Sequence, residues 1–265
     1  MAICSVHIIS LRHGVTLPSL LAALRGAGIK PIAQARVLRW MILPTVLSAG
    51  NLLARNIRWD AVLILSESAP SLSTFSERFI AAEWTATVGT SSKMIAGYAA
   101  RNSELLSTPG PIIPRDTAKA KPAESSGNLE VTPELMDFID GLPEQIRSHP
   151  VSMLNLLAFN EGMHDSYVEY GKQFSERVGK RFGGQVKIVG KVVDAEAGGT
   201  GKGWEEVAFV HYPSIQNFAS MASDEAYQEV NEKHRLGALR DTFILCVMEV
   251  GDDGELAGKP TRGKL

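Results

Sequence analysis

The chain has 265 residues, of which 45% are hydrophobic and 21% charged, and its net charge at pH 7 is −2. That length allows two domains with their own cores, and the composition is typical of a soluble globular protein. The near-neutral charge gives no electrostatic basis for binding nucleic acid or an anionic membrane, so we expect neither partner. Cys4 and Cys246 lie in apolar runs, which favours buried thiols in a cytoplasmic, reducing compartment. The most apolar stretch, Trp40–Ala54, contains a proline and a glycine and is too short to span a bilayer.

Residues 1–106 are expected to form a first α+β unit. Short apolar runs predict strands, and runs that begin near a proline and end near a glycine predict helices. The expected elements are a strand at Cys4–Leu11, a helix at Leu17–Gly28, a strand at Ala35–Ile42, a short covering helix within Pro44–Arg58, a strand at Trp59–Leu65, a helix at Pro70–Ala82 and a partly helical segment at Lys93–Leu106.

A linker is predicted at residues 107–128, because four prolines stand there among serine, alanine and lysine without apolar periodicity. Thr132 and Pro133 then suit the cap and the first turn of a short helix. At the other end of the chain, residues 251–265 form a polar tail that we expect to be frayed.

Residues 129–250 are expected to form a second unit. Its predicted elements are a strand at Val151–Phe159, a helix at Asp165–Phe182, a strand at Val186–Asp194, a strand that follows Trp204, a helix that ends near Leu239 and a strand at Thr242–Val250. The glycine-rich loop at 198–203 lacks the ending of a phosphate-binding loop and does not lead into a helix, so phosphate binding is not expected there.

The two halves share an internal repeat. Residues 204–227 and 59–84 both read Trp-acid-x-Val, an apolar run, Pro-Ser-x-x-x-Phe and an aromatic residue nine positions after that Phe. Residues 6–14 also align without gaps on residues 154–162, each an apolar strand that ends in glycine. Both halves therefore predict the order strand, helix, strand, strand, helix, strand, which is the ferredoxin-like pattern.

The second half also resembles a known family of small proteins, mostly of unassigned function, in the dimeric α+β barrel superfamily. The resemblance covers somewhat under half the chain and rests on Pro150–Phe159, Tyr167, Tyr170, Gly183-Gly184, Tyr212-Pro213-Ser214, Phe218, Tyr227, His234-Arg235 and Leu239-x-Asp241-Thr242. It implies two ferredoxin-like units whose sheets face each other in one barrel. We therefore expect a pseudodimeric α+β barrel in one chain, as a monomer or a homodimer.

The superfamily includes cofactor-free cyclases and monooxygenases, haem-degrading enzymes, dehydratases and isomerases, so the fold alone does not choose the chemistry. Candidate catalytic residues come from polar positions in apolar strands. Asn155 could orient a substrate carbonyl or pin a loop, and His7 could be a base or a satisfied core histidine. His211 could be a general base at a cavity mouth, with Tyr167, Tyr170 or Tyr212 as a hydroxyl partner, or an ordinary strand residue.

The expected substrate-binding residues are Trp204, Phe209, Tyr170, Tyr227 and Arg235. For Arg235 we favour a structural ion pair with Asp241, and for Glu205 and Glu206 we favour exposed charges at a strand edge.

No histidine or cysteine spacing predicts a metal site, and no fingerprint of a dinucleotide or a nucleophile elbow is present, so no cofactor is expected. The favoured hypothesis is a cofactor-independent enzyme of secondary-metabolite biosynthesis that catalyses cyclisation, isomerisation, dehydration or cycloaddition of a small apolar metabolite of polyketide or terpenoid type. The alternatives are a cofactor-free monooxygenase of phenols or anthrones, and a non-catalytic small-molecule binder or assembly subunit.

Overall fold

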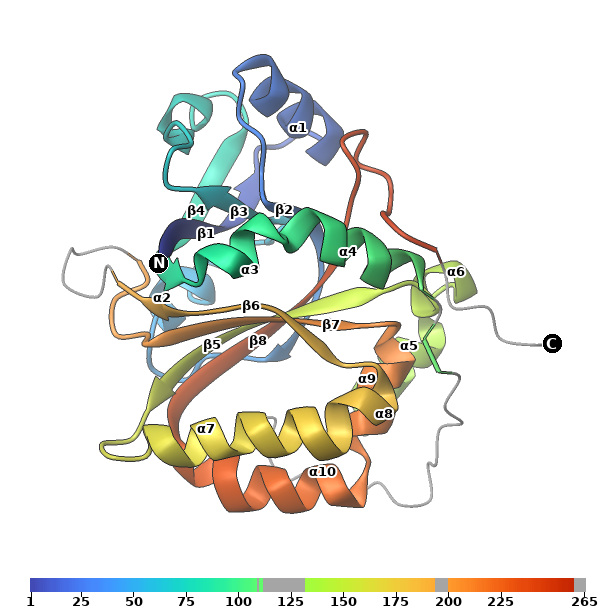
Figure 1. Ribbon diagram of the computed structural model, residues 1–265. Coiled ribbons are helices and arrows are strands. Elements are labelled where there is room, and N and C mark those ends of the chain that lie inside the picture. The colour runs from blue at the N-terminus through green and yellow to red at the C-terminus, as the bar shows by residue number, and fades with distance from the viewer. Residues whose placement is uncertain (109, 112–131, 194–199, 260–265) are drawn as a thin grey trace.

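The computed structural model describes residues 1–108, 110–111, 132–193 and 200–259 (Figure 1). Within these residues the chain forms a closed barrel of eight antiparallel strands, in the order β1-β3-β2-β8-β5-β7-β6-β4. The strands are β1 (Ala2–Leu11), β2 (Ala33–Ile42), β3 (Ala61–Ser66), β4 (Ile80–Thr90), β5 (Val151–Phe159), β6 (Gln185–Val192), β7 (Glu206–Tyr212) and β8 (Leu239–Glu249). Because the barrel is closed within one chain, its strands have no free sheet edge.

The barrel consists of two sheets with the same internal order. The first sheet runs β4-β1-β3-β2 and the second β8-β5-β7-β6, so in each half the fourth strand pairs with the first, and the third lies between the first and second. The pairs β2–β8 and β4–β6 join the sheets. This confirms the predicted fold of two tandem ferredoxin-like units that close one α+β barrel. The turns after β1 and β5 also match, since Gly14 and Gly162 both have positive φ, at +78° and +72°.

Helices surround much of the barrel but leave part of the outer face of the first sheet open (Figure 1). They are α1 (Leu17–Gly26), α2 (Ala49–Leu52), α3 (Ser92–Ala96), α4 (Tyr98–Ser107), α5 (Pro133–Gly141), α6 (Glu144–Arg147), α7 (His164–Gln173), α8 (Lys180–Phe182), α9 (Ile215–Ala222) and α10 (Glu225–Val230), with 3₁₀ turns η1 (Leu72–Phe75) and η6 (Leu236–Ala238) and π-helical turns η4 (Phe174–Gly179) and η5 (Asn231–Arg235). Figure 1 shows α1 on one side of the barrel, α7 and α10 on the opposite side, and α3 and α4 across its front. No helix in the described ranges is both long and apolar enough to cross a membrane.

The first unit departs from its prediction after β3. Instead of a helix at Pro70–Ala82, the chain makes only the single turn η1 and enters β4 at Ile80. Trp84 therefore stands on a strand, whereas Tyr227, its partner in the sequence repeat, stands on α10. The predicted helix is wrong: its last residues, from Ile80, already belong to β4, on which Trp84, Ala86 and Val88 alternate into the barrel interior. The outer face of this part of the first sheet consequently lacks a second helix.

The segments outside the two units have mixed outcomes. Most of the predicted linker at 107–128 lies outside the described residues. The same holds for residues 194–199, which include the last residue of the strand predicted at Val186–Asp194 and the start of the glycine-rich loop. Thr132 caps α5 as expected, with its Oγ1 accepting a hydrogen bond of 3.2 Å from the amide of Leu135. The tail is not frayed over 251–259, because the amide of Ala257 donates to the carbonyl of Glu249 and that of Lys259 to Leu106.

The barrel interior is a packed aromatic core. Trp40, Trp84 and Trp204 each meet the ring of Phe243 edge-on, with centroid distances of 5.4, 5.6 and 5.2 Å. Each such contact adds about 0.5–1.5 kcal/mol beyond the burial of its area. The indole nitrogens of Trp84 and Trp204 both donate to the hydroxyl of Ser48, at 3.0 Å. These rings fill much of the barrel interior.

A buried ionic network lies in the same interior. The ammonium of Lys187 on β6 contacts the carboxylate of Glu249 on β8, and both side chains are almost fully buried. The other carboxylate oxygen of Glu249 accepts hydrogen bonds from the Tyr98 hydroxyl at 3.1 Å and from the Asn102 amide at 2.6 Å. The network therefore ties α4 to the barrel wall. Burial lowers the pKa of Lys187, and Glu249 opposes that shift.

Candidate functional site

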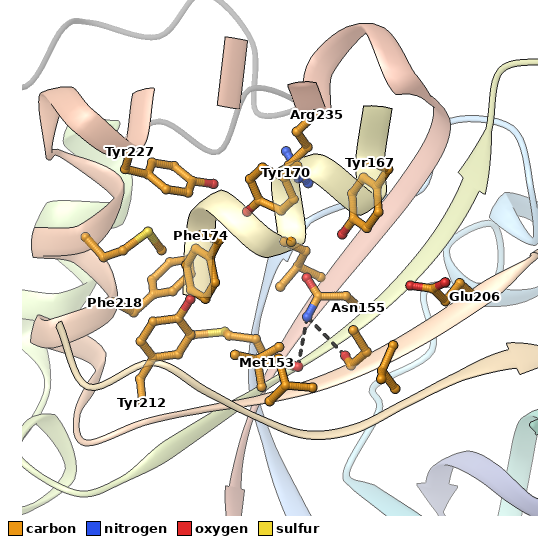
Figure 2. A pocket seen from close by; sticks show the side chains of 17 residues that line it. Met153, Asn155, Tyr167, Tyr170, Phe174, Glu206, Tyr212, Phe218, Tyr227 and Arg235 are labelled. Carbon is orange, nitrogen blue, oxygen red and sulfur yellow. Dashed lines mark hydrogen bonds between the residues drawn. The ribbon is translucent and has the colours of Figure 1, made fainter. Parts of the chain in front are cut away.

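A cavity lies in the second unit, between the outer face of its sheet and the helices α7, α9 and α10 (Figure 2). Its volume is about 230 Å³. It is lined by Met153, Asn155, Tyr167, Tyr170, Gly171, Phe174, Val186, Val189, Glu206, Ala208, Val210, Tyr212, Phe218, Met221, Tyr227, Arg235 and Ile244. Most of this lining is apolar or aromatic, with a few convergent polar groups, which is the usual character of a small-molecule site.

Strand alternation sets the floor of the cavity. Successive side chains of a strand face opposite sides of the sheet, so Glu206, Ala208, Val210 and Tyr212 of β7 face the cavity together. On the neighbouring strand β5, Asn155 does the same. Its amide nitrogen donates to the carbonyls of Met153 at 2.9 Å and Ala208 at 3.1 Å, which leaves its amide oxygen toward the cavity (Figure 2).

A column of aromatic rings from α7 and η4 forms the roof. Tyr167, Tyr170 and Phe174 are three or four residues apart and so lie on one helix face. The ring centroids are 5.2 Å apart between Tyr167 and Tyr170 and 6.1 Å between Tyr170 and Phe174. Both helices over the cavity contain a π-helical turn, η4 and η5, a feature that often marks functional sites.

Arg235, in η5, is the most unusual residue of the lining. It is 2% exposed, its Nη1 donates to the side-chain oxygen of Asn231 at 3.3 Å, and its guanidinium also interacts with the hydroxyl of Tyr167. Among the described residues, Nη2 has no hydrogen-bond partner, and no carboxylate forms a salt bridge with this guanidinium. Burial lowers the pKa of Arg235, but electrostatic interactions with Tyr227, Tyr170 and Tyr167 outweigh burial, so the pKa lies above its ordinary value and the guanidinium stays charged. The cavity therefore holds a permanent, incompletely satisfied positive charge.

The tyrosine hydroxyls around Arg235 stay protonated. Burial raises the pKa of Tyr167, Tyr170, Tyr212 and Tyr227 above the ordinary value for a phenol. The hydroxyl of Tyr227 interacts with that of Tyr170, but no hydrogen bond of good geometry satisfies it among the described residues. These groups can consequently donate hydrogen bonds to an oxygen atom held beside the guanidinium.

Glu206 is the acidic group of the cavity. Its side chain is 17% exposed, and its Oε2 lies 3.6 Å from Nε2 of His164. Burial raises the pKa of Glu206, and the contact with His164 opposes the shift. The expectation that Glu206 is an exposed edge charge is therefore wrong, although it holds better for Glu205, which is half exposed. A carboxyl group with a raised pKa in a cleft is suited to accept and return a proton.

Six of the residues singled out from the sequence meet in this cavity: Asn155, Tyr167, Tyr170, Tyr212, Tyr227 and Arg235. The structure places Trp204, Phe209 and His211 on the opposite face of the sheet, inside the barrel. His211 is 2% exposed, and its pKa is lowered to about 3 by burial and by Lys187. The expected roles of Trp204 and Phe209 in the cleft wall and of His211 as its base are therefore corrected. His7 lies on the first unit, in a separate groove.

The expected ion pair between Arg235 and Asp241 is also wrong. The carboxylate of Asp241 accepts hydrogen bonds from the backbone amides of Thr45, Val46 and Leu47, at 2.7–3.0 Å. It thus fixes the segment before α2 and leaves Arg235 to the cavity. No group of three or more histidine, cysteine, aspartate or glutamate side chains that could hold a metal ion occurs in the part of the chain that the structure describes.

Comparison with known proteins gives only remote similarity. No family model and no curated protein matches the chain. Among solved structures, it is similar to a Rhodopseudomonas palustris protein of unknown function, at 27% identity over 44% of this chain and 93% of that one, with a TM-score of 0.37. It is also similar to proteins of Lactobacillus acidophilus and Fusobacterium nucleatum that are provisionally assigned as monooxygenases. Their identities are 7% and 10%, they cover 97% and 99% of this chain and 97% and 98% of their own, and their TM-scores are 0.47 and 0.46. At these scores the neighbours carry no argument about activity.

Proposed function

We propose that the cavity of the second unit binds a small, largely apolar molecule with one oxygen that is, or becomes, an anion, and that the chain is a cofactor-independent enzyme acting on it. The observation that carries the proposal is the buried guanidinium of Arg235, which has no carboxylate partner among the described residues and lies among protonated tyrosine hydroxyls. A buried charge without a counterion is costly to the fold, and an anionic ligand would remove that cost.

Glu206 and Arg235 would have separate roles, proton transfer and stabilisation of negative charge. Glu206 would take a proton from carbon next to a carbonyl, and Arg235 with the hydroxyls of Tyr170 and Tyr227 would stabilise the enolate oxygen that results. Tyr167 lies near both ends of this arrangement, since Arg235 and Glu206 both act on its pKa. Such an enolate can close a ring, move a double bond or expel water, so cyclisation, isomerisation and dehydration of a polyketide-type or terpenoid-type substrate are the reactions proposed.

Oxygenation of a phenol or anthrone is the second candidate. The same guanidinium would hold a phenolate, and an electron-rich carbanion in an apolar cavity is the species that reacts directly with dioxygen. The candidates differ in one measurable way, because only the oxygenation consumes dioxygen. A protein that binds such ligands without any turnover would instead be a non-catalytic binder.

The first test measures whether binding depends on the charge of the ligand. Dissociation constants of a naphthoate and of its methyl ester are compared for the wild type and Arg235→Met. The wild type should favour the acid by at least about tenfold, equivalent to about 1.4 kcal/mol, and the variant should lose that preference. Equal affinity of the wild type for both ligands would contradict the proposal.

The second test measures proton transfer directly. Exchange of the α-hydrogens of a cyclic aryl ketone with deuterated water is followed by nuclear magnetic resonance, together with oxygen uptake. Glu206→Gln should abolish the exchange, whereas Glu205→Gln, at the adjacent residue outside the cavity, should retain it. Exchange that persists in Glu206→Gln would remove this carboxylate from the mechanism.

A further inference from the structure

A second hollow lies on the first unit, where the second helix of a ferredoxin-like unit is missing. Because η1 replaces that helix, the outer face of β1 and β4 is open beside the loop that follows β3. The groove has a volume of about 430 Å³, and its lining includes Ser5, His7, Ser71, Glu83 and Thr85. It lies on a different sheet from the Arg235 cavity and shares no lining residue with it.

Three side chains in this groove form a hydrogen-bonded series. Nδ1 of His7 lies 2.7 Å from Oε1 of Glu83, and Nε2 of His7 lies 2.7 Å from Oγ of Ser5. The carboxylate can only accept a hydrogen bond, so the proton of a neutral His7 stands on Nδ1 and its Nε2 accepts from the serine hydroxyl. A hydroxyl held against a base, with the base oriented by a carboxylate, is the arrangement that activates a serine nucleophile.

The strands explain why these residues meet. Ser5 and His7 are two residues apart on β1 and so face the same side of the sheet. Glu83 is on β4, which pairs with β1 and places Thr85 opposite His7 and Thr87 opposite Ser5. Side chains directly opposite each other in an antiparallel pair have Cβ atoms about 5 Å apart.

We propose that Ser5, His7 and Glu83 form a second catalytic site, which hydrolyses small uncharged esters through an acyl-enzyme. The two carboxylates in the groove, Glu67 and Glu83, and the absence of lysine and arginine from its lining disfavour an anionic substrate. Ser5 is partly exposed, so its hydroxyl is accessible from the groove. This site is independent of the function proposed for the Arg235 cavity.

The reaction is a balanced acyl transfer to water. The Oγ of Ser5 bonds to the ester carbonyl carbon while its proton passes to Nε2 of His7. The tetrahedral intermediate then breaks its bond to the alcohol oxygen, which takes the proton from His7. Water repeats these steps on the acyl-enzyme and releases the acid, so no oxidant or other co-reactant is required.

The test uses the full chain with p-nitrophenyl acetate and follows p-nitrophenolate release together with the intact mass of the protein. The wild type should carry one acetyl group, which peptide mapping places on Ser5. Ser5→Ala should reduce the release rate at least about a hundredfold, and Glu83→Gln should reduce it as well. Ser66→Ala, at a serine of the same groove that is bonded to Ser68 rather than to His7, should leave the rate unchanged.

A fluorophosphonate probe on the unmodified protein makes the test independent of whether a variant folds. Labelling confined to Ser5 supports the site. Labelling or acetylation at other residues with Ser5 unmodified, or a Ser5→Ala variant that releases p-nitrophenolate at the wild-type rate, would overturn the proposal. Neither result bears on Arg235, so failure of this site and failure of the first proposal are distinguishable.

Discussion

Replacing Arg235 with methionine should stabilise the ligand-free protein while abolishing its preference for anionic ligands. The guanidinium is 2% exposed, and its Nη2 lacks a partner among the described residues. A buried donor left unsatisfied costs about 1–3 kcal/mol, and exchanging buried charged groups for apolar side chains of similar volume often stabilises a protein by about 1–4 kcal/mol. The tyrosine hydroxyls recover part of this cost, so we expect Arg235→Met to raise the free energy of unfolding by about 1–3 kcal/mol.

Urea unfolding at pH 7 measures this difference. The midpoint should rise without a change in slope, because the surface exposed on unfolding is nearly the same. Arg235→Lys is the control, since it keeps a buried charge and should show no stabilisation. A loss of more than about 2 kcal/mol in Arg235→Met would refute the reasoning, because it would mean that the guanidinium is satisfied by the fold and does not await a ligand.

Three further single substitutions and one double variant test which buried polar contacts stabilise the barrel. Lys187→Met should lower the free energy of unfolding by about 3–5 kcal/mol because it leaves Glu249 buried without its cation, and adding Glu249→Leu should restore most of the loss in urea unfolding. Asp241→Asn should destabilise by about 2 kcal/mol at pH 7. Burial opposes ionisation of Asp241, but the backbone amides of residues 45–47 hold its pKa below the ordinary value, so its contribution exists above the unfolded-state pKa and is lost as the pH falls. The difference between wild type and this variant should therefore shrink from about pH 5 to about pH 2 in acid titration. Ser48→Ala should cost about 2 kcal/mol or more in thermal unfolding and alter the near-ultraviolet circular dichroism, because two buried indole N–H groups lose their acceptor.

The barrel could be predicted from the sequence because the internal repeat lies mainly in strand-forming segments of both halves. The apolar strands and the glycine after the first strand of each half were sufficient to predict the ferredoxin-like strand order, which the strand pairing confirms. The prediction failed at Pro70–Ala82, where Leu72, Phe75 and Phe79 imitate the spacing of a helix. The period-two pattern of Trp84, Ala86 and Val88 indicates a strand instead. The structure forms this strand because it is needed to close the barrel.

The site was only partly predictable, because the second sheet is covered on both faces. Val207 and Phe209 point into the barrel while Ala208 and Val210 point to the cavity, so hydrophobicity does not distinguish the faces of β7. Alternation alone nevertheless shows that neighbouring residues such as His211 and Tyr212 cannot both face one cleft. Taking Tyr212 as the reference would have identified Glu206, six positions earlier on the same face.

The two units differ in what covers their outer faces, and this difference explains why each proposed site has its own chemistry. In the second unit, α7 and α10 close over the sheet, so a ligand there is desolvated and the charge of Arg235 acts strongly on it. In the first unit, η1 leaves the sheet open, so water can reach Ser5 and His7. Hydrolysis requires that water, whereas an enolate must be protected from it. The packed tryptophans of the barrel interior separate the Arg235 cavity from the Ser5 groove. Substitutions in one site should therefore not affect the activity of the other.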